Sequence, residues 1–368
     1  MLRPLVIHPP ILNSANPWCS TQEQLEELYA SPYTGAVTTR TSLLSSFPND
    51  ESVHQFTFYN PNTHSATTPN PPQATQAPET GSLNTLGYSP KPLSEYLQII
   101  KAISDSLPDG PPTPSSPIDP TNPPSHKPFI ISVTGTPTEI TTCYSLISTL
   151  QATVKMPLAM EINLSCPNIP QKSPPAYSAS ALLSYLNALK LQLAYQLSSP
   201  EYSATQTVPI GIKTPPYTYS EQFTTMIDAL RESAKPEPVN LPCPISFITA
   251  TNTLGSSLLL TSTLEESENS KPHQVFHHTL NSATGTGIGG LAGAPLHPLA
   301  LGNVYTIKGL LFQYSELEHV QIIGVGGVED VDGFRRMRAV GAAAVGVGTA
   351  LGRKGVAVFE EIGKALDR

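Results

Sequence analysis

The sequence Leu158-Ala159-Met160-Glu161-Ile162-Asn163-Leu164-Ser165-Cys166-Pro167-Asn168-Ile169-Pro170 decides how the rest of the chain is interpreted. Its first half has the length and apolar content of a buried strand, and Pro167 and Pro170 cannot continue that strand in a sheet. Cys166 is therefore expected just beyond the carboxyl end of a strand. Most cysteines outside disulfides are small core residues, but the amides of Asn163 and Asn168 favour a polar ligand site here.

Apolar runs of strand length recur along the chain, and helical patterns separate most of them. The predicted strands cover residues 35–39, 81–87, 128–133, 158–164, 208–213, 245–251, 320–327 and 343–349. This alternation predicts parallel strands joined by right-handed crossovers. Eight such units in one domain predict a TIM (β/α)8 barrel, an α/β fold, rather than an open sheet. The first helix is expected to start where Ser20 and Glu23 have capping-box spacing.

Two proline-rich segments interrupt this pattern, at residues 60–80 and 108–128. Neither has hydrophobic periodicity, so both are expected to be surface insertions. The chain has 368 residues with 39 prolines, and only 13% of its residues are charged. These values are typical of a loop-rich globular protein, and we expect a single domain spanning residues 1–368.

Charge and cysteine content exclude several classes of protein. A net charge of -8 argues against a general binder of nucleic acid or anionic membranes, which needs a basic face. The segment 1–10 is too short and too rich in proline for a signal sequence or membrane span. The four cysteines are widely spaced without a CxxC pair, so neither a zinc site nor a disulfide framework is expected. We therefore expect a cytoplasmic protein without a metal site.

Polar residues follow most of the predicted strands. They are Arg40, Asn84, Asn163, Cys166, Asn168, Lys213 and Asn252. Each alone is more often a surface or capping residue, but in a TIM barrel all the loops after the strands lie at one end. The barrel therefore predicts that these residues share one pocket. The asparagines match a ring with alternating C=O and N–H groups, and Lys213 is suited to the N1 side of a flavin, unless it is a surface lysine.

Glycines follow the last two predicted strands, at Gly326-Gly327 and Gly348-Thr349. Glycine allows a ligand to approach bare backbone N–H groups, and many barrels bind phosphate after strands seven and eight. A phosphate site is favoured here over two tight turns without a ligand. The sequence has no HExxH, GxSxG or Walker pattern, so zinc-protease, hydrolase and NTPase functions have no support.

The segment 163–170 together with Lys172 resembles the dihydroorotate dehydrogenases, specifically their soluble, fumarate-using branch (class 1A). Similar segments follow in the family's order at residues 82–87, 211–217, 251–255, 323–327 and 347–351. The resemblance implies an FMN-containing homodimer that oxidises dihydroorotate to orotate in pyrimidine biosynthesis, with fumarate as electron acceptor. It also implies that Cys166 is the base that removes the C5 proton while hydride passes from C6 to flavin N5.

The resemblance also assigns ligand-binding residues by their matching positions. Those implied to bind substrate are Arg40, Asn84, Thr85, Leu86, Gly87, Tyr88, Asn163, Asn168, Asn252 and Thr253. Those implied to bind FMN are Ala15, Asn16, Arg40, Thr41, Asn163, Lys213, Thr251, Gly293, Gly326, Gly327, Gly348 and Thr349. A thiol with an ordinary pKa of about 8.5 is partly ionised near neutral pH, which is compatible with a base role for Cys166.

Several positions separate the branches of the family. The membrane-bound branch has a serine base and an N-terminal membrane segment, so Cys166 and the segment 1–10 argue against it. Pro170 and Lys172 favour the fumarate branch over the NAD-linked branch, which needs an iron–sulfur partner subunit.

Two residues depart from the usual family pattern. Arg40 stands where family members usually have lysine, and Asn16 where they have glycine. The arginine-containing loop that usually follows the first strand is also not recognisable around residues 47–58. Two alternatives therefore stay open. One is a flavin barrel acting on another dihydropyrimidine or enone, and the other is a catalytically silent relative that binds a ligand or serves as an assembly subunit.

Overall fold

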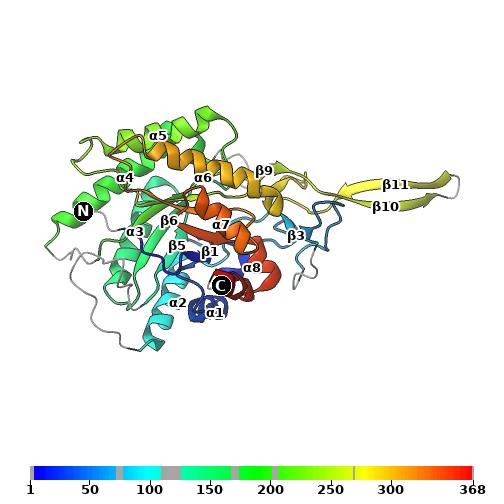
Figure 1. Cartoon of the computed structure of the whole chain (residues 1–368), viewed down its shortest axis with the longest axis horizontal. Helices are drawn as coiled ribbons and strands as arrows, with labels where there is room; N and C mark the ends of the chain where they lie inside the picture. Colours follow the sequence, from blue (N-terminus) through cyan, green and yellow to red (C-terminus); the bar gives the residue numbers. More distant parts are fainter. Residues whose placement is uncertain are drawn as a thin grey trace.

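The computed structural model describes residues 4–71, 78–108, 126–166, 174–200, 206–267 and 270–366. Eight parallel strands form a nearly closed barrel with helices between them (Figure 1). Around the barrel the strands are β1 (Ile11–Asn13), β14 (Ala344–Val347), β13 (Gln321–Val325), β8 (Phe247–Ala250), β7 (Ile210–Lys213), β6 (Leu158–Asn163), β5 (Phe129–Val133) and β2 (Val37–Thr38). A parallel bridge between Leu12 and Ala36 joins the first strand to the last. The predicted TIM barrel is confirmed.

One predicted barrel strand lies elsewhere. The segment 81–87 forms β4 (Gly81–Asn84), which belongs to a separate antiparallel sheet with β3 (Phe56–Tyr59), β12 (Gly289–Gly293) and β9 (Leu254–Ser257). The eighth strand of the barrel is instead β1, which is only three residues long and follows Pro9 and Pro10. So short a strand has no readable periodicity, although both its neighbours in the barrel pair with it.

Nine helices surround the barrel within the described residues (Figure 1). They are α1 (Gln22–Ala30), α2 (Leu93–Ser106), α3 (Pro137–Gln151), α4 (Ala179–Ser198), α5 (Ser220–Ala234), α6 (His297–Leu311), α7 (Val331–Ala339), α8 (Thr349–Lys354) and α9 (Ala357–Leu366). The predicted start of α1 was wrong by one residue. The capping box uses Thr21 and Gln24, whose side chains bond each other's backbone N–H groups, instead of Ser20 and Glu23.

The alternation of side chains along β6 explains how the barrel is filled. Leu158, Met160 and Ile162 pack in the core between the strands and the helices, whereas Ala159 belongs to the cluster inside the barrel. Because successive side chains of a strand point to opposite faces, Glu161 and Asn163 share the inward face with Ala159. The Glu161 carboxylate accepts hydrogen bonds from Ser132 Oγ (3.0 Å) and Thr249 Oγ1 (2.6 Å) on neighbouring strands.

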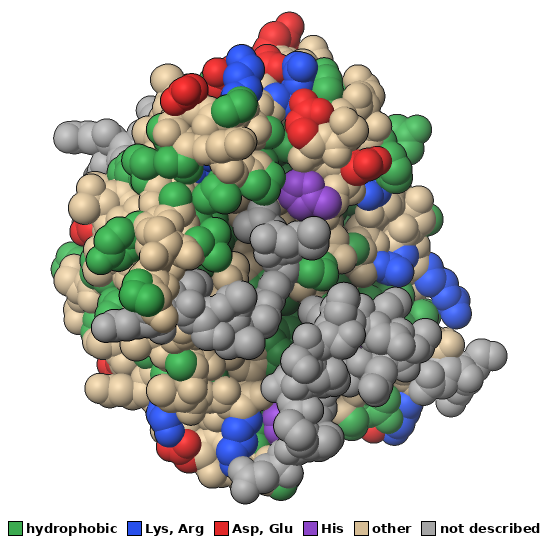
Figure 2. All heavy atoms as spheres, turned by 90° about the vertical axis from the view of Figure 1, so that its left-hand side faces the viewer, with side chains coloured by type: hydrophobic (Ala, Val, Ile, Leu, Met, Phe, Trp, Pro, Cys, Tyr) green, Lys and Arg blue, Asp and Glu red, His purple; other side chains and the backbone are tan. Residues whose placement is uncertain are grey.

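A fully buried lysine connects two of the outer helices. Lys190 on α4 donates from Nζ to the backbone carbonyls of Ser233 (2.8 Å), Lys235 (2.7 Å) and Glu237 (3.1 Å), where α5 ends. The last carbonyls of a helix have no partner within the helix, so the ammonium group takes the place of a C-terminal cap. Among the described side chains visible on the face at the left of Figure 1, the charged ones lie mainly toward the edges of the view (Figure 2).

A long hairpin leaves the body of the molecule between β9 and β12 (Figure 1). It consists of β10 (Leu260–Ser267) and β11 (Ser270–His278), which pair only with each other. Leu264 and Phe276 on this hairpin are 75% and 59% exposed. The sequence predicts no strand here, because this stretch is polar and lacks the buried apolar run of the barrel strands.

The described residues include only part of the two predicted insertions. Residues 72–77 and 109–125 lie outside the description. The described stretch from Asn60 returns alongside β3, where the N–H groups of Thr67 and Asn70 donate to the carbonyls of Phe58 and Phe56, each at 2.8 Å. The division into one domain with two insertions stays a prediction. Among the described helices, none is both long and apolar enough to cross a membrane.

Candidate active site

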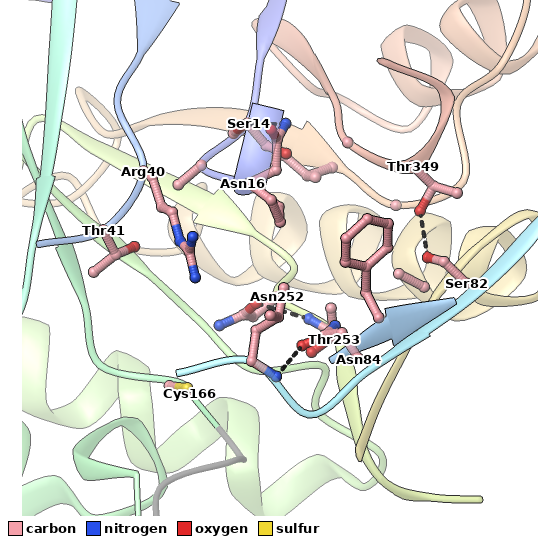
Figure 3. A pocket seen from close by; sticks show the side chains of 18 of the residues that line it. Ser14, Asn16, Arg40, Thr41, Ser82, Asn84, Cys166, Asn252, Thr253 and Thr349 are labelled. Carbon is pink, nitrogen blue, oxygen red and sulfur yellow. Dashed lines mark hydrogen bonds between the residues drawn. The ribbon is translucent and has the colours of Figure 1, made fainter. Parts of the chain in front are cut away.

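A large pocket opens at the carboxyl ends of the barrel strands, with about 1040 Å3 of empty space including the part open to solvent. A volume of this order is sufficient for a cofactor together with a small substrate. The predicted site residues that line it are Ala15, Asn16, Arg40, Thr41, Asn84, Leu86, Gly87, Tyr88, Asn163, Cys166, Lys213, Thr251, Asn252, Thr253, Gly293, Gly326, Gly327, Gly348 and Thr349. Figure 3 shows labelled residues from several elements around this space.

Two predicted substrate residues are not part of this lining. Asn168 lies outside the described residues. Thr85 is buried behind the pocket wall, where its hydroxyl is paired with the backbone carbonyl of Val53 (2.8 Å) and the N–H of Gln55 (3.0 Å). It therefore holds the loop before β3 rather than facing the pocket. Its neighbours Asn84 and Leu86 do line the pocket.

Hydrogen bonds fix the asparagine side chains in the pocket. Asn163 donates from Nδ2 to Thr41 Oγ1 (3.1 Å), and its Oδ1 accepts from Ser165 Oγ (3.0 Å). Asn252 donates from Nδ2 to Asn163 Oδ1 (3.3 Å) and to Ser165 Oγ (3.0 Å). Asn84 at the end of β4 donates from Nδ2 to the backbone carbonyl of Gly290 (3.2 Å). The amides thus have defined orientations before a ligand binds, which suits recognition of a flat polar ring.

Arg40 and Lys213 are the only charged side chains in the described lining, and no carboxylate accompanies them. Arg40 donates from Nη2 to the carbonyls of Gly87 (3.4 Å) and Tyr88 (3.3 Å), and burial lowers its pKa. Lys213 is only 4% exposed, and within the described residues its ammonium has neither a hydrogen bond nor an ion pair. A buried ammonium needs an acceptor, so the pocket is built for an anionic or acceptor-rich ligand.

The glycines after β13 and β14 present backbone N–H groups at the other end of the pocket. The N–H groups of Gly326, Gly327, Gly348 and Thr349 donate to no backbone carbonyl in the described part of the chain. Gly327 has φ of +65°, and a Cβ there would lie 2.6 Å from the carbonyl oxygen of Gly293, so only glycine fits. Free N–H groups at such a turn are suited to phosphate oxygens.

The side chain of His297 holds the turn after β13 in place through a hydrogen bond to its backbone. Arg336 Nε donates to His297 Nε2 (3.1 Å), so the ring hydrogen lies on Nδ1, which donates to the carbonyl of Gly326 (2.7 Å). Burial is the main cause that lowers the pKa of His297, and the neighbouring Arg336 lowers it further. The histidine is therefore neutral near pH 7, and its hydrogen bond holds the backbone of the turn.

Cys166 differs from the other cysteines of the chain in its surroundings. It is partly exposed and lines the pocket, whereas Cys19, Cys143 and Cys243 are fully buried. Burial raises the pKa of Cys19 and of Cys143 to about 12. Cys166 is therefore the cysteine placed for chemistry on a ligand in this pocket.

One side of the pocket is aromatic, and its residues were not predicted from the sequence. Trp18 and Phe56 line it, with ring centroids 5.3 Å apart in an edge-to-face contact, and Phe58 stacks on Trp18 at 5.7 Å. Ser82 was also missed, and its hydroxyl is 2.8 Å from Thr349 Oγ1. Phe56 and Phe58 alternate along β3 as inward residues of a strand would, which is the signal that could have revealed them.

The fold and site together define a (β/α)8-barrel enzyme with a thiol, fixed amides and two cations at the active end of the barrel. The sequence model of the family described as "Dihydroorotate dehydrogenase" matches residues 59–368, more than half of the chain. The chain belongs to the dihydroorotate dehydrogenase family, which confirms the predicted family and the prediction of an oxidoreductase.

Curated relatives are similar over nearly the whole chain. The "Putative dihydroorotate dehydrogenase A (fumarate)" of Streptococcus pyogenes serotype M1 is 28% identical over 97% of this chain and 88% of its own length. The "Dihydroorotate dehydrogenase (fumarate)" of Trypanosoma cruzi is 28% identical over 96% of this chain and 87% of its own. A solved structure, that of the Eimeria tenella enzyme DHODH in complex with ferulenol, has a TM-score of 0.64 at 16% identity and covers 98% of this chain and 81% of that one. At that identity the likeness shows the fold alone.

Proposed function

We propose that this protein is an FMN-dependent dihydroorotate dehydrogenase that oxidises (S)-dihydroorotate to orotate, with fumarate as electron acceptor, in pyrimidine biosynthesis. Membership of the family supports the reaction, and the names of the curated relatives support the acceptor. The observation that carries the proposal is that Cys166 and the buried cation Lys213 line one pocket with the bare N–H groups after β13 and β14. That combination joins a base, a flavin-compatible cation and a phosphate site.

The residues present fit FMN. The N–H groups of Gly326, Gly327, Gly348 and Thr349 would hold the phosphate, and the ammonium of Lys213, which lacks an acceptor among the described residues, would face the ring. The remaining ring contacts would come from Ala15, Asn16, Arg40, Thr41, Asn163, Thr251 and Gly293. When bound, FMN supplies the hydride acceptor that no side chain can provide.

The polar side chains of the pocket perform the binding steps. Asn84, Asn163 and Asn252 offer amide donors and acceptors from three different elements, so they would hold the substrate ring in one orientation. Asn168, which is not among the described residues, is also proposed to bind the substrate. Leu86, Gly87, Tyr88 and Thr253 would complete the substrate side of the pocket. Fixed donors position the ring with little ordering cost on binding, which favours a reactive alignment.

Cys166 is proposed to remove the C5 proton as a thiolate. The C5 proton is acidic because the carbon lies next to a carbonyl, and a base with a pKa near the working pH transfers protons efficiently. The charge of Arg40 favours the ionised thiol, because the two side chains interact electrostatically. The thiol then carries the proton on sulfur, and it must lose that proton before the next turnover.

The surroundings proposed for this activity follow from the family resemblance. We propose a cytoplasmic homodimer that acts on small molecules and binds neither nucleic acid nor membranes. The chain carries 28 acidic and only 20 basic residues, which supports the exclusion of nucleic acid. Sedimentation of the purified protein tests the dimer, and a monomer at micromolar concentration would overturn it.

Anaerobic titration of the FMN-loaded protein tests the reaction. We expect dihydroorotate to bleach the flavin absorbance and fumarate to restore it. FMN that binds but is not bleached would refute the substrate. Bleaching without recovery by fumarate would refute only the acceptor.

One observation favours a second substrate class. Arg40 stands at the lysine position of the family, and one of its nitrogens is already used by the carbonyls of Gly87 and Tyr88. Arginine and lysine differ in shape and number of donors, so the pocket could be matched to another dihydropyrimidine or enone. The same bleaching assay with a panel of such compounds separates the two. A protein that takes up no FMN would instead be the catalytically silent relative.

A further inference from the structure

A second, smaller cavity lies behind Cys166, lined among others by Tyr88, Thr134 and Asn163. The volume in which the centre of a water molecule fits is about 10 Å3, which is close to the minimum needed to hold one water. Cys166 and Tyr88 line both this cavity and the large pocket. The thiol therefore has the proposed substrate site on one side and, on the other, a small chamber with both polar and apolar lining residues.

Tyr88 is held firmly at this chamber. Its backbone carbonyl accepts the hydrogen bond from Arg40, its ring packs edge-on against Phe47 with centroids 5.8 Å apart, and the residue is 8% exposed. Burial raises the pKa of Tyr88, and a negative charge on Cys166 would raise it further. The phenol consequently keeps its hydrogen in the neutral pH range and can act as a donor.

The other hydroxyls at the chamber are committed elsewhere. Tyr185 donates from its hydroxyl to the carbonyl of Gly135 (2.7 Å), and Thr134 donates from Oγ1 to the carbonyl of Asn163 (2.9 Å). The Tyr88 hydroxyl lies near Thr134, whose side chain acts to lower the pKa of the phenol. Since the single hydrogen of Thr134 is given to the carbonyl of Asn163, the Tyr88 hydroxyl keeps its own hydrogen for another acceptor. A phenol hydrogen can turn to a new acceptor, and a bond to an anion is about twice as strong as a bond to a neutral hydroxyl.

We propose that Tyr88 is a positioning residue that donates a hydrogen bond to the Cys166 thiolate, directly or through one water in this chamber, and so extends the working range of the base to lower pH. The inference deepens the proposed function and rests on Cys166 being the base. It assigns Tyr88 a role on the thiol in addition to its place in the substrate pocket.

Four titratable side chains face Cys166 in the described part of the chain, on different elements. Arg40 follows β2, Tyr88 precedes α2, Tyr185 lies on α4, and Lys213 ends β7, the strand beside β6. Arg40 stays charged and burial keeps both phenols neutral by raising their pKa. Of the two phenols, only Tyr88 has a hydroxyl that is able to turn to the sulfur.

The pH dependence of thiol alkylation tests this role without cofactor or substrate. Iodoacetamide reacts with the thiolate, and the three other cysteines are fully buried, so the rate reports Cys166. Cys166→Ala gives the background. We expect Tyr88→Phe to raise the midpoint of the alkylation curve by about one pH unit, which is about tenfold slower reaction at a fixed pH below it. Phenylalanine retains the ring that packs on Phe47.

Tyr185→Phe is the matched control, because it removes a phenol from the same chamber whose hydrogen is given to Gly135. Its midpoint should equal that of the unaltered protein. An unchanged midpoint in Tyr88→Phe, or an equal shift in both variants, would overturn the inference. The pH profile of flavin reduction should shift by the same amount. A shift in alkylation without bleaching by dihydroorotate would refute the proposed reaction and leave the role of Tyr88 intact.

Discussion

The pocket has two walls of different origin. The barrel wall is made by parallel strands, whose inward residues at the strand ends include Asn163 on β6 and Lys213 on β7. The opposite wall comes from the antiparallel sheet of β3, β4, β12 and β9, and contributes Phe56 and Asn84. The barrel wall carries the thiol, both cations and the glycines suited to phosphate, whereas the added sheet contributes uncharged residues such as Phe56, Asn84 and Gly293. We infer that the barrel supplies the residues that react, and that the added sheet supplies shape complementarity to the substrate.

The largest effect is expected at the barrel wall. Cys166→Ala should slow reduction of bound flavin by dihydroorotate by about 100- to 10,000-fold, because a positioned base contributes a factor of that order. FMN absorbance of the purified variant should be unchanged. Stopped-flow measurement of flavin reduction gives the rate. A rate within a few fold of the unaltered protein would contradict the assignment of the base to the barrel wall.

The next effect is expected at the cation of the same wall. Lys213→Met should weaken FMN binding by about 10- to 100-fold, since a hydrogen bond to a charged group is worth about 1.5–3 kcal/mol. Fluorescence titration of the flavin measures the affinity. Lys101→Met on the exposed side of α2 serves as control and should bind FMN normally. Equal affinities for both variants would show that the buried ammonium does not contact the cofactor.

The added sheet should affect substrate more than cofactor. A Cβ on Gly290 of β12 would lie 2.1 Å from Thr253 Oγ1, so Gly290→Ala must displace that side chain from the pocket wall. We expect the KM for dihydroorotate to rise about tenfold, on the scale of one lost hydrogen bond, while FMN affinity is retained. Gly302→Ala in α6, where a Cβ meets nothing, controls for the substitution itself. Loss of FMN instead would show that the sheet supports the cofactor.

The smallest effect is expected from pH at the turn after β13. The pKa of His297 is lowered in the folded protein, so the unfolded chain binds more protons as pH falls through the ordinary range of histidine. Stability should therefore be complete above about pH 6.5 and should decrease as pH falls below it. Urea unfolding from pH 5 to 7.5 measures this, and His297→Gln should flatten that part of the curve. A variant with the same slope would exclude His297 as the cause.

The two walls also differ in how far the sequence predicts them. Most of the longer barrel strands are apolar runs that end in or are followed by a polar residue, so Asn163, Cys166 and Lys213 could be assigned to one pocket from the chain alone. The added sheet could not be assembled in this way, because its strands come from distant segments and their pairing has no local signal. For that reason β4 was placed in the barrel and the three-residue β1 was overlooked.

Fine detail within correctly predicted regions also depended on tertiary structure. Thr85 belongs to a family segment that faces the ligand, yet its hydroxyl is used by the backbone of Val53 and Gln55. The cap of α1 could be formed by either of two neighbouring hydroxyls, and the orientation of the chain entering the helix selected Thr21. The chamber behind Cys166 is formed by residues from four separate parts of the chain, so its existence could be seen only after folding.

The buried Lys190 provides a covalent reporter of local opening between α4 and α5. Its ammonium group is enclosed by three carbonyls at the end of α5, and it is fully buried. An acylating reagent needs a neutral, accessible amine, so surface lysines should be labelled quickly while Lys190 is labelled only when α4 and α5 separate. The rate of its acylation, read by mass spectrometry under native conditions, would then measure how often this part of the barrel opens.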